Sequence, residues 1–411
     1  MKRNLMYLFL MILEAGYSQI APAVNVGTFY VSENTNVSII GDFNNTETAT
    51  YENNGEVLFK GNFTNDGITG FNASLNGYTR FEGVLNQDIK GKIMADFKNV
   101  LFNNTNTQPA FRLYNGISIA GRADFSRGIV DNDAFGGLFV FGNLGNHINA
   151  SDQSFVDGPV IKDGSTDFVF PVGDKEHYRF EAMSAPGNNS SSFIGKYFFE
   201  NSNPLYPHTN KASNIVLIDN AEYWTFEKGA GDDVLLTLSW DENSTTPEPV
   251  VASPYEDIHI VRWDSQRNLW IDEGGVADSG RKTVTTAVNL TNYGVFTLGR
   301  VENSSDCVEV YNLVTPDDDG FNDTFQIKCI NSFPENTVEI YNRWGVKVFE
   351  TNNYNSSGNV FKGYSQGRTT VAPNKMLPAG TYFYILEYEN NQTSGVKKVK
   401  KAGYLYLQTK E

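Results

Sequence analysis

Histidine, cysteine and long apolar segments are scarce in this 411-residue sequence, and these absences limit what it can do. The two cysteines are too few for a zinc site. No His-Glu-x-x-His or Gly-x-Ser-x-Gly motif, phosphate loop or dinucleotide fingerprint occurs. The four histidines stand far apart, without carboxylate or cysteine neighbours at metal-ligand spacing: His147, His177, His208 and His259. We therefore predict a non-enzymatic protein without a cofactor other than calcium.

Long segments with a helical period of 3.6 residues are also missing, whereas Asn, Gly, Thr, Phe and Tyr are plentiful. This composition favours short strands joined by tight turns, and therefore an all-β fold. With 40% hydrophobic and 19% charged residues, the chain can form proper cores rather than remain disordered. Beyond the first residues, no segment is apolar enough to cross a membrane as a helix. We therefore do not expect an integral membrane protein.

Positive charge is in short supply before residue 303. The net charge is −16, and residues 303–411 hold 12 acidic and 11 basic side chains, which leaves −15 on the preceding residues. Proteins bind the phosphate backbone of nucleic acids through Lys and Arg. Because the residues before 303 are acidic, nucleic acid is excluded as their partner.

The first 18 residues have the pattern of a secretory signal peptide. Lys2 and Arg3 precede an apolar run from Leu5 to Leu13, and small residues follow, with Ser18 at the expected cleavage position. A buried N-terminal helix is the alternative, whereas the run is too short to span a bilayer. We predict a signal peptide at residues 1–18 and a mature chain that leaves the cytoplasm.

Residues 24–148 carry a loose repeat, seen in Gly41–Asn45 and again in Gly61–Asn65. We expect a β-solenoid in which each coil places apolar side chains in a stacked core and turns its corners with Asn and Gly. One set of aromatic residues is spaced at 14 to 20 positions and is expected to mark successive coils: Phe43, Phe63, Phe81, Phe97, Phe111, Phe125 and Phe139. Phe59, Phe71 and Phe102 interrupt this series, and an ordinary antiparallel sandwich is the alternative.

Residues 149–302 show longer alternating segments, such as Val234–Trp240 and His259–Trp263, and they predict an antiparallel β-sandwich. A short polar linker around residue 303 marks a domain boundary. The remaining residues, 303–411, contain further alternating segments, among them Val338–Tyr341, Val346–Phe349, Gly380–Tyr388 and Ala402–Leu407. They predict a compact immunoglobulin-like sandwich.

Four blocks of the last domain resemble, in order, the gliding motility-associated C-terminal domain, a sorting domain of the Bacteroidetes type IX secretion system. The blocks are Thr315–Phe325, Val338–Gly345, Leu377–Tyr384 and Ala402–Leu407, and the resemblance covers residues 308–411. The family usually has Thr-Pro-Asn-Gly-Asp-Gly where this chain reads Thr-Pro-Asp-Asp-Asp-Gly from Thr315 to Gly320, so the local turn is expected to differ.

The resemblance implies a protein carried through the outer-membrane translocon and recognised by a β-barrel shuttle protein. It would pass through the periplasm and reach the cell surface or the extracellular space. On the matching blocks it implies a sorting role for Asn342, Arg343, Trp344, Gly345, Gly380 and Tyr382. The expected passenger is structural, adhesive or gliding-associated.

Four lysines precede the last strand: Lys397, Lys398, Lys400 and Lys401. They could steer this domain towards an acidic partner, while the last strand docks by edge pairing. Alternatively, they protect an edge strand against aggregation. Trp344 and Gly345 are expected to form a hairpin with a tryptophan in the core rather than a ligand platform.

Two local features of the last domain leave alternatives open. Asp317, Asp319, Asn322 and Asp323 crowd oxygen ligands around a glycine, as in calcium loops, but Lys328 stands where an EF-hand has its closing Glu. The alternative is an Asx-type turn, in which these side chains bind their own backbone. An oxidising compartment would allow Cys307 and Cys329 to form a disulfide, and two free thiols are equally compatible with the sequence.

A secreted polysaccharide-active enzyme is the alternative function. Such an enzyme needs two or three carboxylates on one face of the solenoid. The candidates in this sequence are Asp42, Glu82, Asp96 and Asp124.

Overall fold

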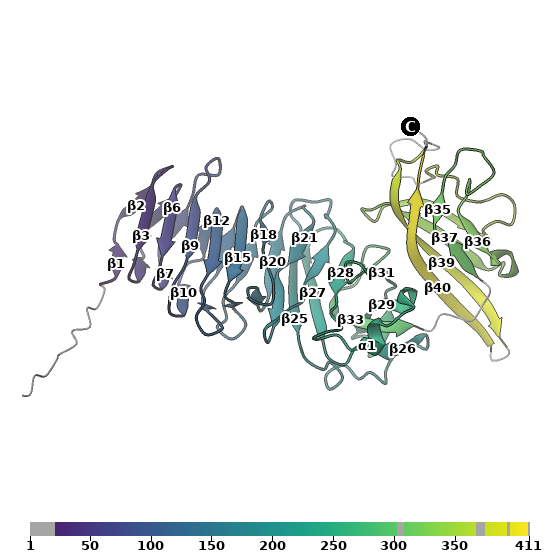
Figure 1. Ribbon diagram of the computed structural model, residues 1–411, viewed down its shortest axis with the longest axis horizontal. Coiled ribbons are helices and arrows are strands. Elements are labelled where there is room, and N and C mark those ends of the chain that lie inside the picture. Colours follow the sequence, from purple (N-terminus) through teal and green to yellow (C-terminus); the bar gives the residue numbers. More distant parts are fainter. Residues whose placement is uncertain (1–20, 302–307, 367–374, 393–394, 410–411) are drawn as a thin grey trace, which may run out of the picture.

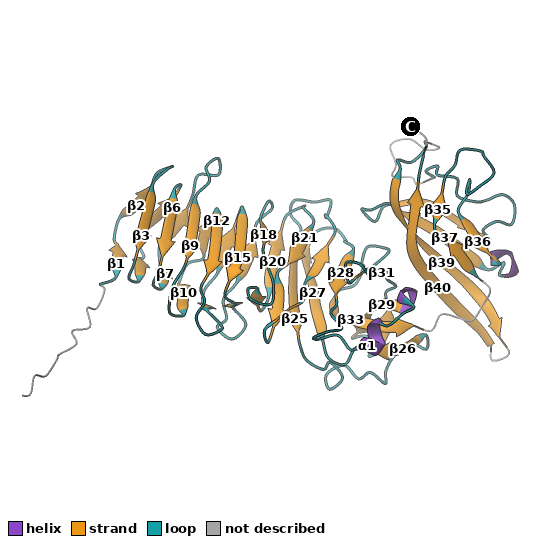
Figure 2. Cartoon of the chain, in the orientation of Figure 1, coloured by secondary structure: helices purple, strands orange, loops and turns teal. Residues whose placement is uncertain are grey.

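The computed structural model describes residues 21–301, 308–366, 375–392 and 395–409 (Figure 1). The signal peptide expected at residues 1–18 lies outside these ranges. Strands dominate the fold, and within the described ranges helix is confined to three short segments (Figure 2): α1 (Glu248–Val251), η1 (Tyr255–Asp257) and η2 (Ile330–Ser332). In the described part of the chain, no helix has the length and hydropathy needed to span a bilayer.

The N-terminal half is a β-solenoid with six complete turns of three strands each. Each turn contributes one strand to each of three faces, and the strands of a face pair in parallel. Face one contains β1 (Ala23–Asn25), β4 (Phe43–Asn45), β7 (Phe63–Asn65), β10 (Gln87–Gly91), β13 (Phe111–Leu113), β16 (Val130–Asp131), β19 (Val156–Asp157) and β22 (Val172–Asp174), with β23 (His177–Tyr178) at its end.

The other two faces are built in the same way. Face two is divided between two sheets: β2 (Thr28–Val31), β5 (Thr50–Asn53) and β8 (Ile68–Gly70) form the first, and β11 (Ala95–Phe97), β14 (Ile117–Ile119), β17 (Phe139–Phe141) and β20 (Val160–Asp163) begin the second. Face three contains β3 (Asn36–Ile39), β6 (Glu56–Phe59), β9 (Tyr78–Phe81), β12 (Asn99–Asn103), β15 (Arg122–Arg127) and β18 (Asn146–Ile148).

Columns of identical side chains hold successive coils together. On face three the rings of four fully buried phenylalanines stack along the axis with centroids 5.5 to 5.9 Å apart: Phe59, Phe81, Phe102 and Phe125. At the end of face one, the Asn45 amide donates to Asn65 Oδ1 and accepts from Asn25, each at 2.8 Å. Such ladders satisfy buried polar groups while the rings bury apolar area against the next coil.

The expectation that these phenylalanines lie in a stacked core is therefore confirmed. The expectation that each of them marks the next coil is wrong. Only Phe43 and Phe63 of the series are neighbours in register, and the remaining members are distributed over three faces. Phe59 and Phe102, which seemed to interrupt the series, belong to the column on face three. The reason is that all three faces contribute phenylalanines, so a single list of them mixes three columns.

The repeated segments Gly41–Asn45 and Gly61–Asn65 do stack directly on one another. Phe43 pairs with Phe63 and Asn45 with Asn65 in the parallel ladder. A methyl group on Gly61 would lie 2.6 Å from the backbone carbonyl group of Gly41. Glycine at this corner is thus required by the close approach of two coils.

The solenoid runs into an antiparallel region without a break in the core. Parallel pairing passes the boundary expected at residues 148 and 149 and continues to β20 and β22, after which β20 pairs antiparallel with the next strand of its sheet. One hydrophobic cluster extends from Val31 to Leu298. Face two continues with β25 (Ser192–Phe198), β27 (Tyr223–Ala230), β33 (Gly294–Val301), β29 (Ile258–Asp264) and β30 (Leu269–Asp272), with β26 (Ile215–Ile218) beside β33.

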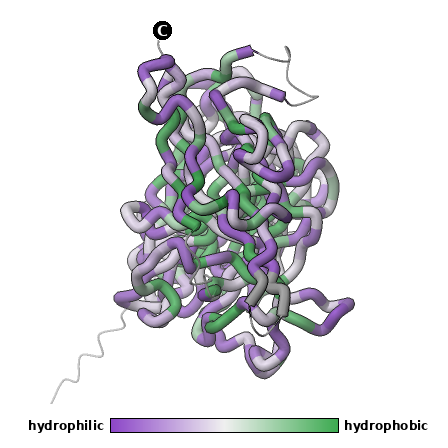
Figure 3. The backbone as a smooth tube through the Cα atoms, turned by 90° about the vertical axis from the view of Figure 1, so that its right-hand side faces the viewer, coloured by the Kyte–Doolittle hydropathy of each residue, from purple (hydrophilic) through white to green (hydrophobic). Residues whose placement is uncertain are grey.

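A second antiparallel sheet covers this extension and completes a sandwich. It contains β21 (Phe168–Phe170), β24 (Glu181–Met183), β28 (Leu236–Ser239), β32 (Thr283–Thr285) and β31 (Val276–Asp278). In the view along the long axis in Figure 3, hydrophobic residues gather towards the middle and hydrophilic residues mark the peripheral loops.

The C-terminal domain has a hydrophobic core of its own, from Val308 to Leu407. Its main sheet has the order β35 (Leu313–Val314), β40 (Gly395–Leu407), β39 (Gly380–Gln392), β37 (Asn336–Tyr341) and β38 (Lys347–Asn352). A second, two-stranded sheet is formed by β34 (Glu309–Tyr311) and β36 (Gln326–Lys328). The four strands expected from the alternating segments are all present; β37, β39 and β40 are longer than expected, and β38 begins one residue later, at Lys347, and extends to Asn352.

Candidate functional site

The turn between β37 and β38 holds the first group of expected sorting residues. Asn342 Oδ1 accepts hydrogen bonds from the backbone N–H groups of Trp344 and Val346, both at 3.0 Å. Gly345 has a φ of 73°, which favours glycine. The hairpin is thus as expected, and its geometry is set by Asn342 and Gly345.

Trp344 is 51% exposed, so the expectation that it is a core tryptophan is wrong. It stands at the tip of the turn, too far along the hairpin to reach the core. Its ring is covered instead by the Arg343 guanidinium, at 4.2 Å from the ring centroid. A large aromatic ring paired with a cation at a turn is available for contact with another protein.

The same hairpin touches the region that precedes the C-terminal domain. A methyl group on Gly345 would lie 2.1 Å from Asn289 Oδ1. Nearby, Tyr341, Ile385 and Ala402 of the C-terminal domain share a small apolar cluster with Val276 and Ala287, which precede the linker. The outer face of the C-terminal sheet is therefore partly covered by the rest of the chain.

Gly380 and Tyr382 lie at the start of β39, opposite the end of β40. Gly380 pairs with Leu407 and Tyr382 with Leu405. Tyr382 is buried, its hydroxyl donates to the Pro378 carbonyl oxygen at 2.9 Å, and burial raises its pKa. These two residues therefore lie at the open end of the β39–β40 hairpin, opposite its turn, and their sorting role stays a prediction.

The four lysines expected before the last strand lie inside it, because β40 begins at Gly395, and three of them have partners within the chain. Lys398 and Lys400 lie 3.6 and 3.5 Å from Glu389 and Glu387 on the neighbouring strand. Lys401 donates to the Val308 carbonyl oxygen at 2.7 Å. The backbone of the remaining lysine, Lys397, pairs with Asn390. The steering role stays a prediction, and opposing glutamates reduce the charge available for it.

The outer edge of β40 has little strand pairing. Only its last two residues pair with β35, through Leu313 and Val314. In the sheet order of the described residues, no other strand adjoins that side of β40. An edge of this kind is suited to docking by pairing with a strand of another protein.

The aspartate loop brings three of its four predicted ligands together. Carboxylate oxygens of Asp317, Asp319 and Asp323 lie within 4.8 Å of one another. Asp323 also accepts backbone N–H groups from Asp318 at 2.7 Å and Gly320 at 2.8 Å. Asp319 Oδ1 accepts the N–H of Phe321, two residues on, at 2.8 Å, and this bond forms the Asx-type turn.

The fourth predicted ligand, Asn322, contributes its backbone carbonyl oxygen to a hydrogen bond from the Thr315 N–H at 2.8 Å. The loop therefore uses both side chains and backbone to hold its own shape. Three clustered carboxylates have the donor chemistry that calcium prefers. Calcium binding at this loop stays a prediction.

Cys329 is disulfide-bonded. It precedes η2 with a φ of 59°. Cys307, the other cysteine of the sequence, lies outside the described residues.

The structure does not bring the four candidate carboxylates of the solenoid together. Asp42 lies just before face one, where its carboxylate accepts the Asn62 N–H at 2.9 Å. Asp96 is on face two, and burial raises its pKa. Glu82 follows β9 and pairs with Arg80 at 2.6 Å, and Asp124 is in β15 on face three. The four carboxylates are thus spread over three faces, and only Glu82 and Asp124 belong to the same one.

Sequence reasoning missed a different pair of acids, Asp131 and Asp157, which are register neighbours on face one. Burial and the neighbouring Asp131 raise the pKa of Asp157 to about 7. It also missed a buried network in the sandwich, where Glu222 accepts the Tyr197 hydroxyl at 2.6 Å and burial raises the pKa of this Glu. The residues of the acid pair and of the buried network come from segments far apart in sequence, so no local sequence pattern predicts that they meet.

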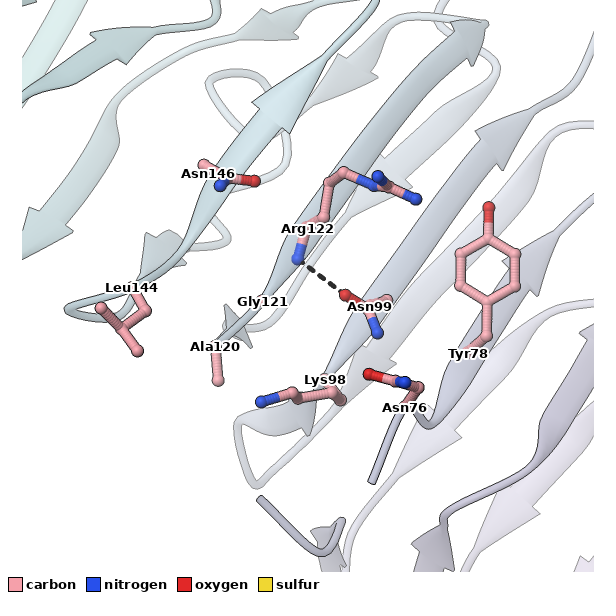
Figure 4. A pocket seen from close by; sticks show the side chains of 9 residues that line it. All are labelled: Asn76, Tyr78, Lys98, Asn99, Ala120, Gly121, Arg122, Leu144 and Asn146. Carbon is pink, nitrogen blue, oxygen red and sulfur yellow. Dashed lines mark hydrogen bonds between the residues drawn. The ribbon is translucent and has the colours of Figure 1, made fainter. Parts of the chain in front are cut away.

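A further pocket opens on face three of the solenoid, with a volume of about 700 Å³. Figure 4 shows side chains from successive strands along it, including Tyr78, Asn99, Arg122 and Asn146. Asn99 Oδ1 accepts the backbone N–H of Arg122 at 2.9 Å, which fixes this amide against the next coil. None of these residues belongs to a motif that could be picked out in the sequence.

Comparison with protein families identifies only the C-terminal domain. The family model of the CHU_C type IX secretion signal domain matches residues 308–407. No curated protein and no solved structure matches the chain significantly. The matched residues coincide with the separate core of this domain. The domain is thus the signal that directs a cargo to the type IX secretion machinery and so to the cell surface or beyond.

Proposed function

We propose that this type IX secretion cargo carries a non-enzymatic passenger with a structural or adhesive role at the cell surface. The observation that supports the passenger role is the continuous core from Val31 to Leu298, which makes the solenoid and the sandwich one elongated body (Figure 1). An elongated body with polar outer faces is suited to contact over a length rather than to chemistry in one cleft.

The proposed route has two membrane crossings. The signal peptide at residues 1–18 would direct the first, into the periplasm. The C-terminal domain would direct the second, through the outer-membrane translocon and with recognition by a β-barrel shuttle protein. The exposed Trp344 and the open edge of β40 are the features that support recognition by another protein.

Deletion of residues 303–411 tests the route. We expect the truncated chain to accumulate in the periplasm, where external protease cannot reach it, while the full chain is degraded on intact cells. The solenoid and sandwich have their own core, so the truncated chain should keep the melting behaviour of this region. Truncated protein on the cell surface would refute the sorting role.

A polysaccharide-active enzyme is the second candidate, favoured by the pair Asp131 and Asp157. A carboxyl group with a pKa of about 7 beside a second acid is an arrangement that supplies an acid and a base at neutral pH. Purified mature protein would be incubated with a panel of polysaccharides. Cleavage that is lost in Asp157→Asn would establish the enzyme and overturn the non-enzymatic passenger, whereas we expect no cleavage.

A further inference from the structure

The pocket on face three is built from the same position of four successive coils. Tyr78 pairs in register with Asn99, and Arg122 with Asn146, in neighbouring parallel strands. Lys98 also lines the pocket. Parallel strands are about 4.8 Å apart, so the pocket offers polar side chains at a regular interval along the solenoid axis.

Two cations in this pocket have no acidic partner. Among the described residues, neither Lys98 nor Arg122 forms an ion pair, and no carboxylate lines the pocket, although the Lys98 ammonium donates to the Ala73 carbonyl oxygen at 3.0 Å. Elsewhere on the solenoid, Arg80 pairs with Glu56 at 2.6 Å and Arg112 with Asp88 at 2.6 Å. Unpaired cations are notable in a chain with a net charge of −16, because nearby acids usually neutralise them.

The groups around these cations restrict the ligand further. The Asn146 amide can both donate and accept, as hydroxyl groups require, whereas the Asn99 amide accepts the Arg122 N–H and donates to the Gly77 carbonyl oxygen at 3.2 Å, so it shapes the pocket floor. The half-buried Tyr78 ring and the 70% exposed Leu144 add apolar surface. Guanidinium binds a carboxylate or sulfate with two parallel hydrogen bonds. A polymer with many hydroxyls, apolar ring faces and repeated negative charges satisfies all these groups.

We infer that this pocket binds an anionic polysaccharide that lies along the solenoid axis, with Arg122 as the main partner of its acidic group. The inference rests on the proposed adhesive role of the passenger and names its ligand class. Asp124, two residues from Arg122 on the same strand, is not among the lining residues, and its carboxylate accepts a hydrogen bond from the Asn149 amide at 2.8 Å.

Binding would be measured with the full mature chain and polygalacturonate, with dextran sulfate and uncharged dextran as comparison polymers. We expect Arg122→Gln to weaken polygalacturonate binding at least about tenfold and Lys98→Gln about threefold. Arg127→Gln is the matched control, because Arg127 is in the same strand, is exposed and forms no ion pair among the described residues, but does not line the pocket. It should bind like the unaltered chain.

Several outcomes overturn the inference. Equal losses in Arg122→Gln and Arg127→Gln would reduce the binding to general attraction of polyanions, and equal binding of dextran would remove the charge requirement. Equal binding of polyglutamate would indicate that the ligand is an acidic peptide rather than a glycan. Tighter binding of dextran sulfate than of polygalacturonate would indicate that the acidic group of the ligand is a sulfate. This result would support the inference, because a sulfated glycan is also an anionic polysaccharide. Absence of binding in a chain that still reaches the surface would refute the ligand class and leave the proposed delivery intact.

Discussion

In the solenoid, each coil buries its side chains against the coils before and after it, whereas the C-terminal domain packs its own two sheets around a separate core. The first arrangement makes stability depend on contacts between neighbours along one axis. The second makes it depend on closure of a sandwich by strands distant in sequence. The passenger and its signal should therefore respond differently to single changes, although both are all-β.

The largest effect is expected for Phe81→Ala. The Phe81 ring is fully buried between Phe59 and Phe102, and its loss should lower the free energy of unfolding by about 3–5 kcal/mol. In urea unfolding followed by two probes, only the transition of the solenoid should move. The control Val84→Ala removes an 81% exposed side chain and should change little. A joint shift of both transitions would show that the two regions unfold together.

Removal of the disulfide should destabilise the C-terminal domain rather than the solenoid. Cys329→Ser is expected to destabilise the C-terminal domain by about 2–4 kcal/mol, since the cross-link restricts its unfolded state. The transition of the solenoid should stay in place. Reductant added to the unaltered chain should reproduce the shift, and a reductant-insensitive melt would contradict it.

The asparagine ladder tests whether coils depend on their neighbours. Asn45→Ala leaves Asn65 Oδ1 without its donor at 2.8 Å, and the Ile68 carbonyl oxygen loses another at 3.0 Å. We expect a loss of about 1–3 kcal/mol, confined to the solenoid transition. Asn44→Ala, whose side chain alternates to the opposite side of the strand, is the matched control. Equal losses for the two variants would argue against the ladder.

A smaller, pH-dependent effect is expected at Asp157. Its folded pKa of about 7 lies above the unfolded value near 4, so its contribution to stability is full below pH 4 and is lost as pH rises to 7. Asp157→Asn should match the unaltered chain at pH 4 and exceed it by about 1 kcal/mol at pH 8, after allowance for partial exposure. Thermal melts at both pH values measure this, and a pH-independent difference would contradict it.

The smallest effect on stability is expected for Trp344→Ala, below about 0.5 kcal/mol, because the ring is at a turn and 51% exposed. Surface delivery, measured with external protease, should nevertheless fall. Phe349→Ala in the adjacent strand removes a buried ring and should destabilise the C-terminal domain strongly. Unchanged delivery of Trp344→Ala would exclude this residue from recognition.

Local patterns predicted the C-terminal strands well, because apolar and polar residues that alternate over several positions are typical of a half-buried strand. Val338–Tyr341, for example, lies within β37. The solenoid register was harder, since Phe97 and Phe125 belong to different faces and only pairing distinguishes them. Nor could sequence show that Trp344 remains exposed, or that Asp131 and Asp157 become neighbours. Each of these features depends on which strands lie next to one another, and the packing of the whole core determines that arrangement.

The stacking of Gly41–Asn45 on Gly61–Asn65 gives the passenger a natural unit of length. Because one coil is nearly interchangeable with the next at this point, duplication of a coil would extend the body by about 4.8 Å and leave the C-terminal domain untouched. The reach of the protein from the cell can thus change in small steps, independently of the signal that brings it there.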